Sequence, residues 1–298
     1  MHSQIELTEE QKALRKKSLE KLLNTSLIQD FMKKYQLDAS FIEKNRDYFA
    51  MWVERIAQCR NCTGISFCQQ PISGKVKSLF INPRGYLEEA FVSCRYKKTE
   101  DKKIEHRKNF RLAHMSEQDY EVQLESIDLM NENKDYILAY TSIVDSFDQD
   151  KGIFLYGQPG VGKTYLLLGL ANQYAKNDQK VSFVRVPQLL QDIKQAMYDS
   201  EYRSDVINHL RYSDIVFLDD IGAESVSVWT RDEILLPILE FRMNHHKKTY
   251  FSSNYKLEEL EKQYEIRNES NTGISSMRIL ERIKALANPV QMKGRSRR

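Results

Sequence analysis

The segment Gly157–Thr164 constrains the possible folds of this chain more than any other stretch. It matches the phosphate-binding pattern G-x-x-x-x-G-K-[ST]. The apolar run 152–156 before it is typical of a buried strand, and the run 165–174 after it is typical of a helix. The pattern requires this order, because the glycines let backbone N–H groups turn inward around a polyphosphate at the start of a helix. The sequence therefore predicts a nucleotide site within an α/β fold.

Two loop residues have individual roles in such a site. Lys163 would reach the β- and γ-phosphates of ATP, and the Thr164 hydroxyl would hold Mg²⁺. The residues expected to bind the nucleotide are Gly157, Gln158, Pro159, Gly160, Val161, Gly162, Lys163 and Thr164. The predicted cofactors of this part of the chain are ATP or ADP with Mg²⁺.

Strands and helices alternate after the loop. The predicted strands are 152–156, 180–186, 213–220, 248–254 and 289–292. Strands separated by helices form a parallel sheet with ligands at its carboxyl ends. We therefore expect a P-loop domain with a parallel sheet over residues 126–298.

Polar residues end two of these strands. Asp219 is the expected second Mg²⁺-directing acid, and Asp220 is the expected base that orients or activates the attacking water. Glu224 is the alternative base. Asn254 ends the following strand, where its amide could bond the γ-phosphate or the water. These side chains are predicted to meet the phosphate loop at one edge of the sheet.

Composition limits the other function classes. Lys plus Arg number 45 against 42 Asp plus Glu, so any nucleic-acid surface must be local rather than global. No apolar run is long enough to span a bilayer, and the first residues lack a signal-peptide pattern, so we expect a cytoplasmic protein without membrane contact.

The residues before the P-loop domain are predicted to form a smaller α+β domain, 1–105, followed by a linker, 106–125. Its helices include one capped at Thr8 and one over 41–58 that begins with a capping box at Ser40. A hairpin over 75–95, turning at 82–85, would bring four cysteines together. They are Cys59, Cys62, Cys68 and Cys94, the expected ligands of a structural zinc ion. Unligated thiols are the alternative.

The loop, the acidic pair, Asn254 and the segment 278–282 together resemble those of an AAA+ ATPase. Within that class, 218–224 and 277–282 are similar to the bacterial replicative helicase loaders of the DnaI/DnaC type, and the cysteine-bearing domain resembles the DnaI branch. The resemblance covers essentially the whole chain. It implies self-association through the ATPase domain, with ATP bound between neighbouring subunits. Arg278 would be the arginine supplied in trans and Arg282 the second sensor, or the two roles could be exchanged.

The resemblance also implies partners. The N-terminal domain would bind the hexameric replicative DNA helicase, the ATPase domain would touch single-stranded DNA, and other primosome proteins would assemble with them. The candidate DNA contacts are Arg185, Lys194, Tyr198, Tyr202, Arg203 and the basic tail 293–298, which could instead be disordered.

Two other functions remain open from the sequence. One is a transposition-helper ATPase, whose ATPase domain is similar but which is not expected to carry the cysteine module. The other is a nucleotide-gated adaptor with negligible turnover, because many ATPases of this class carry Glu where this chain has Asp220.

Overall fold

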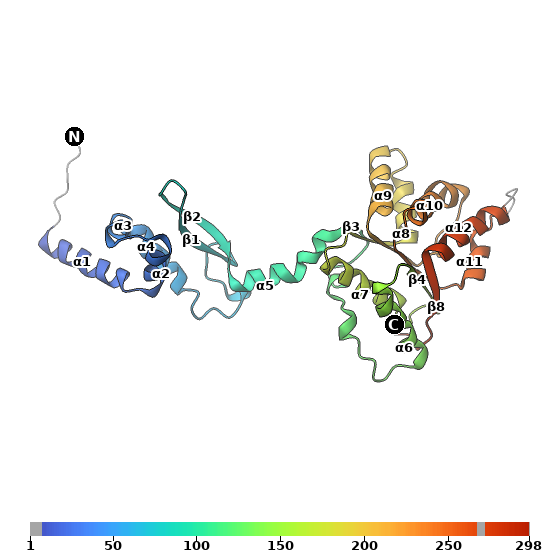
Figure 1. The fold of residues 1–298 in the computed structure, drawn as a ribbon, viewed down its shortest axis with the longest axis horizontal. Helices are drawn as coiled ribbons and strands as arrows, with labels where there is room; N and C mark the ends of the chain where they lie inside the picture. Colours follow the sequence, from blue (N-terminus) through green and yellow to red (C-terminus); the bar gives the residue numbers. More distant parts are fainter. Residues whose placement is uncertain (1–7, 267–271, 298) are drawn as a thin grey trace. The chain divides into compact units, whose positions relative to one another are not determined.

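The structure, a computed structural model, describes residues 8–266 and 272–297. The chain divides into two compact units, Met1–Lys103 and Ile104–Arg298 (Figure 1). In the described residues, no helix combines the length and the apolar character needed to cross a membrane.

The first unit opens with helices that pack around an aromatic core. The helices are α1 (Glu9–Leu23), α2 (Ser26–Tyr35), α3 (Ala39–Lys44) and α4 (Arg46–Ala57). Thr8 caps α1 in a capping box with Gln11, as the sequence predicts. The helix predicted over 41–58 is wrong in two respects, because it is divided at Asn45 and its cap is Asp38 instead of Ser40. The Asp38 carboxylate accepts a hydrogen bond from the Phe41 N–H, so the helix begins two residues earlier than a Ser40 cap would allow.

The predicted hairpin follows the helices. Strand β1 (Lys75–Ile81) pairs antiparallel with β2 (Leu87–Ser93), and the Asn82 side chain accepts two backbone N–H groups of the turn. The Trp52 indole donates to the Lys77 carbonyl at 2.8 Å and ties α4 to β1. Helix α5 (Arg95–Ile104) comes after β2. The α+β character predicted for this unit is confirmed.

The second unit contains a parallel sheet in the order β3-β5-β6-β7-β4-β8. Its strands are β3 (Phe110–Ala113), β4 (Gly152–Tyr156), β5 (Val181–Arg185), β6 (Ile215–Asp219), β7 (Thr249–Ser253) and β8 (Ala287–Gln291). The helices are α6 (Lys134–Asp145), α7 (Lys163–Lys176), α8 (Val186–Gln195), α9 (Ser200–Tyr212), α10 (Leu236–Asn244), α11 (Leu257–Tyr264) and α12 (Thr272–Leu286). A π-helical segment, Trp229–Leu235, leads directly into α10.

The sheet is covered on both faces. Along β6, Ile215 and Phe217 belong to the core shared with α6 and α7, whereas Val216 and Leu218 belong to the core shared with α8 to α12. Strand side chains alternate between faces, so a strand buried on both sides reads as a continuous apolar run. The predicted α/β class with a parallel sheet is confirmed. Because β6, β7 and β4 are neighbours in the parallel sheet, their carboxyl ends lie side by side.

Strand β3 differs from the predicted arrangement. It lies within residues 106–125, predicted as a linker, yet it pairs with β5 at the edge of the sheet. The strand has four residues and none is fully buried: Phe110 packs against one core and Leu112 against the other, while the strand pairs along one edge only.

Candidate nucleotide-binding site

The phosphate loop connects β4 to α7 and depends on its glycines. Gly157, Gly160 and Gly162 have φ angles of 156°, 84° and 106°, a region that residues with a side chain rarely adopt. At Gly157 an added Cβ would lie 2.0 Å from the Met292 carbonyl oxygen. The chain therefore needs glycine there for space as well as for conformation.

Lys163, at the first position of α7, is held inside the loop. Its Nζ donates to the carbonyls of Gly157 at 2.8 Å and Gln158 at 3.0 Å. A third bond, of 2.8 Å, reaches Oδ1 of Asn254 beyond the end of β7. Lys163 as a whole is 6% exposed, so water screens its charge little and the charge acts strongly on neighbouring groups of the site.

Asp219 ends β6 opposite Thr164. The Thr164 hydroxyl donates to both carboxylate oxygens of Asp219, at 3.0 and 3.1 Å, and the Ser252 hydroxyl donates to Oδ1 at 2.5 Å. Burial raises the pKa of Asp219, and the hydrogen bonds from Ser252 and Thr164 oppose this rise. A hydroxyl and a carboxylate at this separation are oxygen donors of the kind that Mg²⁺ prefers.

Asp220 turns back toward Asn254. Its φ of 58° is left-handed, and its backbone N–H donates to the Ser252 hydroxyl at 2.9 Å. Asn254 Nδ2 donates to Oδ1 of Asp220 at 3.0 Å. Asn254 thus bridges Asp220 to Lys163, which joins the acidic strand end to the phosphate loop.

These groups line one cavity of about 380 Å³. Its lining is Pro159, Gly160, Gly162, Lys163, Thr164, Tyr165, Arg185, Asp219, Asp220, Ser252, Asn254 and Arg297. The cavity is mostly polar and holds both cations and carboxylates. Such a lining can hold a polyphosphate with a divalent cation and leaves a carboxylate beside it to orient water.

Four members of the lining lie outside the set predicted for this site, and one of them, Tyr165, directly follows the phosphate loop. Ser252 comes two residues before Asn254 on β7, and its polar side chain in a buried strand was a readable signal. Arg185, predicted as a DNA contact, ends β5 beside Asp219. Arg297 belongs to the tail predicted as a DNA contact or as disordered, and no periodic pattern marks it.

Glu224, the alternative base, is turned away from this cavity. Its carboxylate is buried and accepts hydrogen bonds from the Gly222 N–H at 2.7 Å and from the Tyr264 hydroxyl. Burial raises its pKa. These partners occupy Glu224 in holding the loop after β6 against α11.

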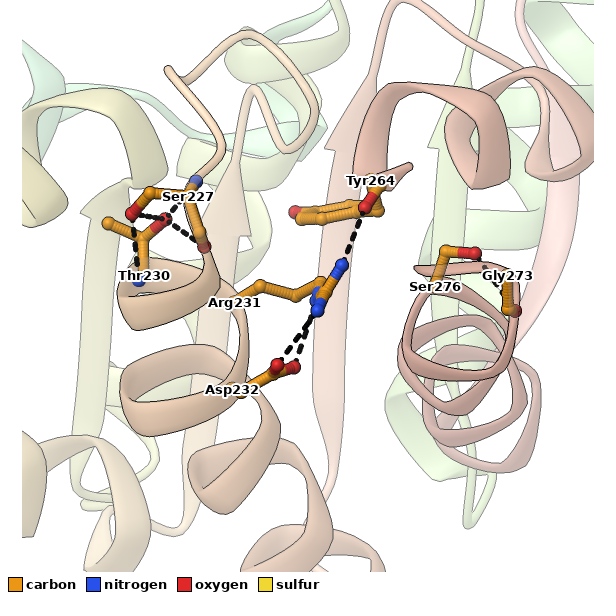
Figure 2. A network of polar contacts seen from close by, with 7 residues as sticks. All are labelled: Ser227, Thr230, Arg231, Asp232, Tyr264, Gly273 and Ser276. Atoms are coloured by element: carbon orange, nitrogen blue, oxygen red, sulfur yellow. Dashed lines mark hydrogen bonds and ion pairs between the residues drawn. The ribbon is translucent and has the colours of Figure 1, made fainter. Parts of the chain in front are cut away.

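The two arginines of α12 also lie outside the cavity lining. Arg282 forms an ion pair with Glu240 at 3.4 Å. Arg278 is exposed. The hydrogen bonds from Arg231 are the main cause of the lowered pKa of Asp232, and the positive charges of Arg231 and Arg278 lower this pKa further. Figure 2 shows the buried Arg231 guanidinium between the Asp232 carboxylate and the Tyr264 carbonyl, which it reaches at 3.1 Å. This network joins the π-helical segment to α11.

The four cysteines line a separate pocket of about 300 Å³ in the first unit. Backbone N–H groups donate to two of the sulfurs, from Gly74 to Cys68 and from Lys97 to Cys94. However, among the described residues no group of three or more Cys, His, Asp or Glu has the spacing needed to hold a metal ion. The hairpin brings the thiols to one pocket, as predicted, but their geometry does not show a zinc site.

The phosphate loop, the acidic strand end and the parallel sheet define the class of the protein as a P-loop nucleotide-binding protein. The chain belongs to the family described as IstB-like ATP binding protein, whose model matches residues 92–298.

Individual relatives refine this assignment. The replicative helicase loader DnaI of Bacillus subtilis (strain 168) is 27% identical over 287 residues, which span 94% of this chain and 91% of that protein. A crystal structure of DnaI matches 65% of this chain and 99% of its own, with a TM-score of 0.55 and 29% identity. A protein described as an ATP-binding protein of insertion sequence IS232, from Bacillus thuringiensis subsp. berliner, is 30% identical over 90 residues, 30% of this chain and 35% of that protein. The expected resemblance to helicase loaders is confirmed.

Proposed function

We propose that this chain is an ATP-dependent loader that binds the hexameric replicative DNA helicase and helps to place it on single-stranded DNA during primosome assembly. The observation that carries the proposal is the similarity to a helicase loader across 94% of the chain, which includes both units. A cytoplasmic location in a bacterium follows from this role.

ATP hydrolysis would use the groups gathered in the cavity. Lys163 binds the β- and γ-phosphates, and Thr164 with Asp219 holds Mg²⁺, which when bound neutralises charge on the phosphates. Asp220 orients the attacking water and accepts its proton. Asn254, which already bridges Lys163 and Asp220, keeps that carboxylate in line with the γ-phosphate.

Self-association would complete the site. Arg278 is exposed on α12 of its own chain and lies outside the cavity lining, which suits a residue that serves a neighbouring subunit. An arginine supplied in trans would stabilise the charge that develops on the transferred phosphoryl group and link hydrolysis to assembly. Arg282, paired with Glu240, would support α12 in this arrangement.

The N-terminal domain, 1–105, would bind the helicase and carry zinc. Four free cysteines around one pocket and the two N–H···S contacts support the zinc proposal. The domain from 126 to 298, together with β3, would be the ATPase. Elemental analysis of the chain purified without chelator tests the zinc proposal for the N-terminal domain: about one zinc ion per chain is expected.

Single-stranded DNA would contact the ATPase domain near α8 and α9. Tyr198 is 100% exposed between these helices, and Tyr202 follows on α9. Exposed aromatic rings with Lys194 and Arg203 nearby in sequence are suited to base stacking and phosphate contact.

A transposition-helper ATPase is the second candidate, because the matching family takes its name from an insertion-sequence protein. The insertion-sequence protein matches only 30% of this chain, whereas the loader matches both units. A nucleotide-gated adaptor with negligible turnover is the third, since Asp220 is one methylene shorter than Glu. Phosphate release with and without helicase and DNA separates the adaptor from the enzyme.

Co-purification with the hexameric replicative helicase of the same organism tests the proposal. We expect the full chain to retain the helicase and Lys163→Ala to lose ATP binding. Lys176→Ala, on the exposed end of the same helix, is the matched control and should bind ATP normally. A full chain that binds ATP but retains no helicase would contradict the loader function.

A further inference from the structure

The segment after β8, residues 292–297, packs against the phosphate loop, and we call it the strap. At its start, the Met292 N–H donates to the Tyr156 carbonyl at 2.7 Å, and the Met292 carbonyl fills the space left by the missing side chain of Gly157. At its end, Arg297 lies against Gly162, whose missing Cβ would be 3.4 Å from the Arg297 Cδ. The strap therefore contacts the loop at both ends.

Arg297 makes the central contacts. Its backbone N–H donates to the Gly160 carbonyl at 2.9 Å, and its Nε donates to the Val161 carbonyl at 3.2 Å. In a trans peptide plane, a carbonyl and the following N–H point in opposite directions. Holding these two carbonyls toward Arg297 therefore turns the N–H groups of Val161 and Gly162 away from the strap, into the loop.

The Arg297 side chain is itself anchored. Its Nη2 forms an ion pair with Glu132 at 2.6 Å, and its guanidinium lies 4.1 Å from the centre of the Tyr136 ring. The Glu132 side chain is only 8% exposed, so this pair is better shielded from water than an ordinary surface ion pair. Lys293 adds a second, exposed pair with Asp135 at 3.6 Å. The strap is thus fastened to the residues that begin α6.

No arginine of α12 lines the cavity, whereas Arg297 does. We propose that Arg297 is a positioning residue of the nucleotide site, which acts in cis through the carbonyls of Gly160 and Val161. This inference rests on the proposed binding of ATP. Because the inward N–H groups belong to the part of the loop that cradles phosphates common to ATP and ADP, Arg297 supports the binding of both nucleotides alike.

The test is equilibrium binding of fluorescently labelled ATP and ADP to the full chain. We expect Arg297→Ala to raise the Kd for ATP and for ADP by about tenfold each, the effect of losing one charge-assisted hydrogen bond. Arg297→Lys keeps the charge beside Glu132 but lacks the planar fork, and it should recover only part of the affinity. Arg295→Ala is the control, since no hydrogen bond or ion pair joins Arg295 to the described residues.

A structural role alone would lower the melting temperature of the nucleotide-free chain, whereas a positioning role changes affinity at an unchanged melting temperature. If Arg297→Ala has a lower melting temperature than the wild-type chain, the nucleotide affinities of Arg297→Lys and the wild-type chain are compared instead. Wild-type affinity in Arg297→Ala, an effect on ATP without one on ADP, or an equal loss in Arg295→Ala would each overturn the inference. A wild-type chain that binds no ATP would overturn the proposed function as well, so the two failures are distinguishable.

Discussion

Replacing Ser252 by alanine removes one hydroxyl that makes two bonds at the centre of the site. Ser252 Oγ donates to the Asp219 carboxylate at 2.5 Å and accepts the Asp220 N–H at 2.9 Å. Both Ser252 and Asp219 are almost fully buried. Without the hydroxyl, Thr164 alone orients the Asp219 carboxylate, and the turn that carries Asp220 loses a fixed point.

The size of the effect follows from these contacts. A hydrogen bond to a charged group contributes about 1.5–3 kcal/mol. Since about 1.4 kcal/mol corresponds to a factor of ten, loss of the bond to Asp219 should weaken Mg²⁺ binding by about 10- to 100-fold. Removal of a residue that orients a metal ligand typically has this magnitude.

The assay is ATP hydrolysis as a function of Mg²⁺ concentration. Ser252→Ala should raise the half-saturating Mg²⁺ concentration by about tenfold or more. Ser253→Ala is the matched control, because its buried hydroxyl donates to the Ile221 carbonyl at 2.7 Å and does not touch Asp219. Wild-type Mg²⁺ dependence in Ser252→Ala, or an equal shift in Ser253→Ala, would refute the assignment of Ser252 to the metal-binding side of the site.

Three further substitutions have distinct expected outcomes. Asn254→Ala should lower the turnover rate by about 100-fold with a smaller loss of ATP affinity, because it frees Asp220 from Lys163; single-turnover kinetics separate the two. Glu224→Gln should leave turnover unchanged and Asp220→Asn should abolish it, and the reverse result in a phosphate-release assay would make Glu224 the base. Arg242 is fully buried and donates to five backbone carbonyls, so Arg242→Met should destabilise the fold by about 3 kcal/mol or more in denaturant unfolding, while a neutral result would contradict this structural role.

The phosphate loop and the apolar strands could be predicted because their signals are local. Gly157–Thr164 carries its function in a fixed pattern, and β6 reads as a continuous apolar run because helices cover both of its sides. The meeting of Asp219, Asp220 and Asn254 with Lys163 followed from parallel topology, which gathers the carboxyl ends of strands at one edge.

Features that depend on long-range packing could not be predicted. Strand β3 is stabilised by pairing with β5, and its own residues carry little strand signal. Arg297 gains its position from Glu132 and Tyr136, which are distant in sequence. The spacing of the four cysteines indicated a common pocket, and they line one. A spacing pattern does not fix the positions of the sulfur atoms, however, and the described residues contain no group of side chains arranged to hold a metal ion.

The loading function is tested most directly by measuring how much hexameric replicative helicase is retained on closed circular single-stranded DNA in the presence of this chain and ATP. A closed circle admits a ring only if the ring is opened or assembled around it. The account predicts a large increase in retained helicase with the wild-type chain and none with Lys163→Ala. Equal retention with the wild-type chain, with Lys163→Ala and with no added chain would contradict it.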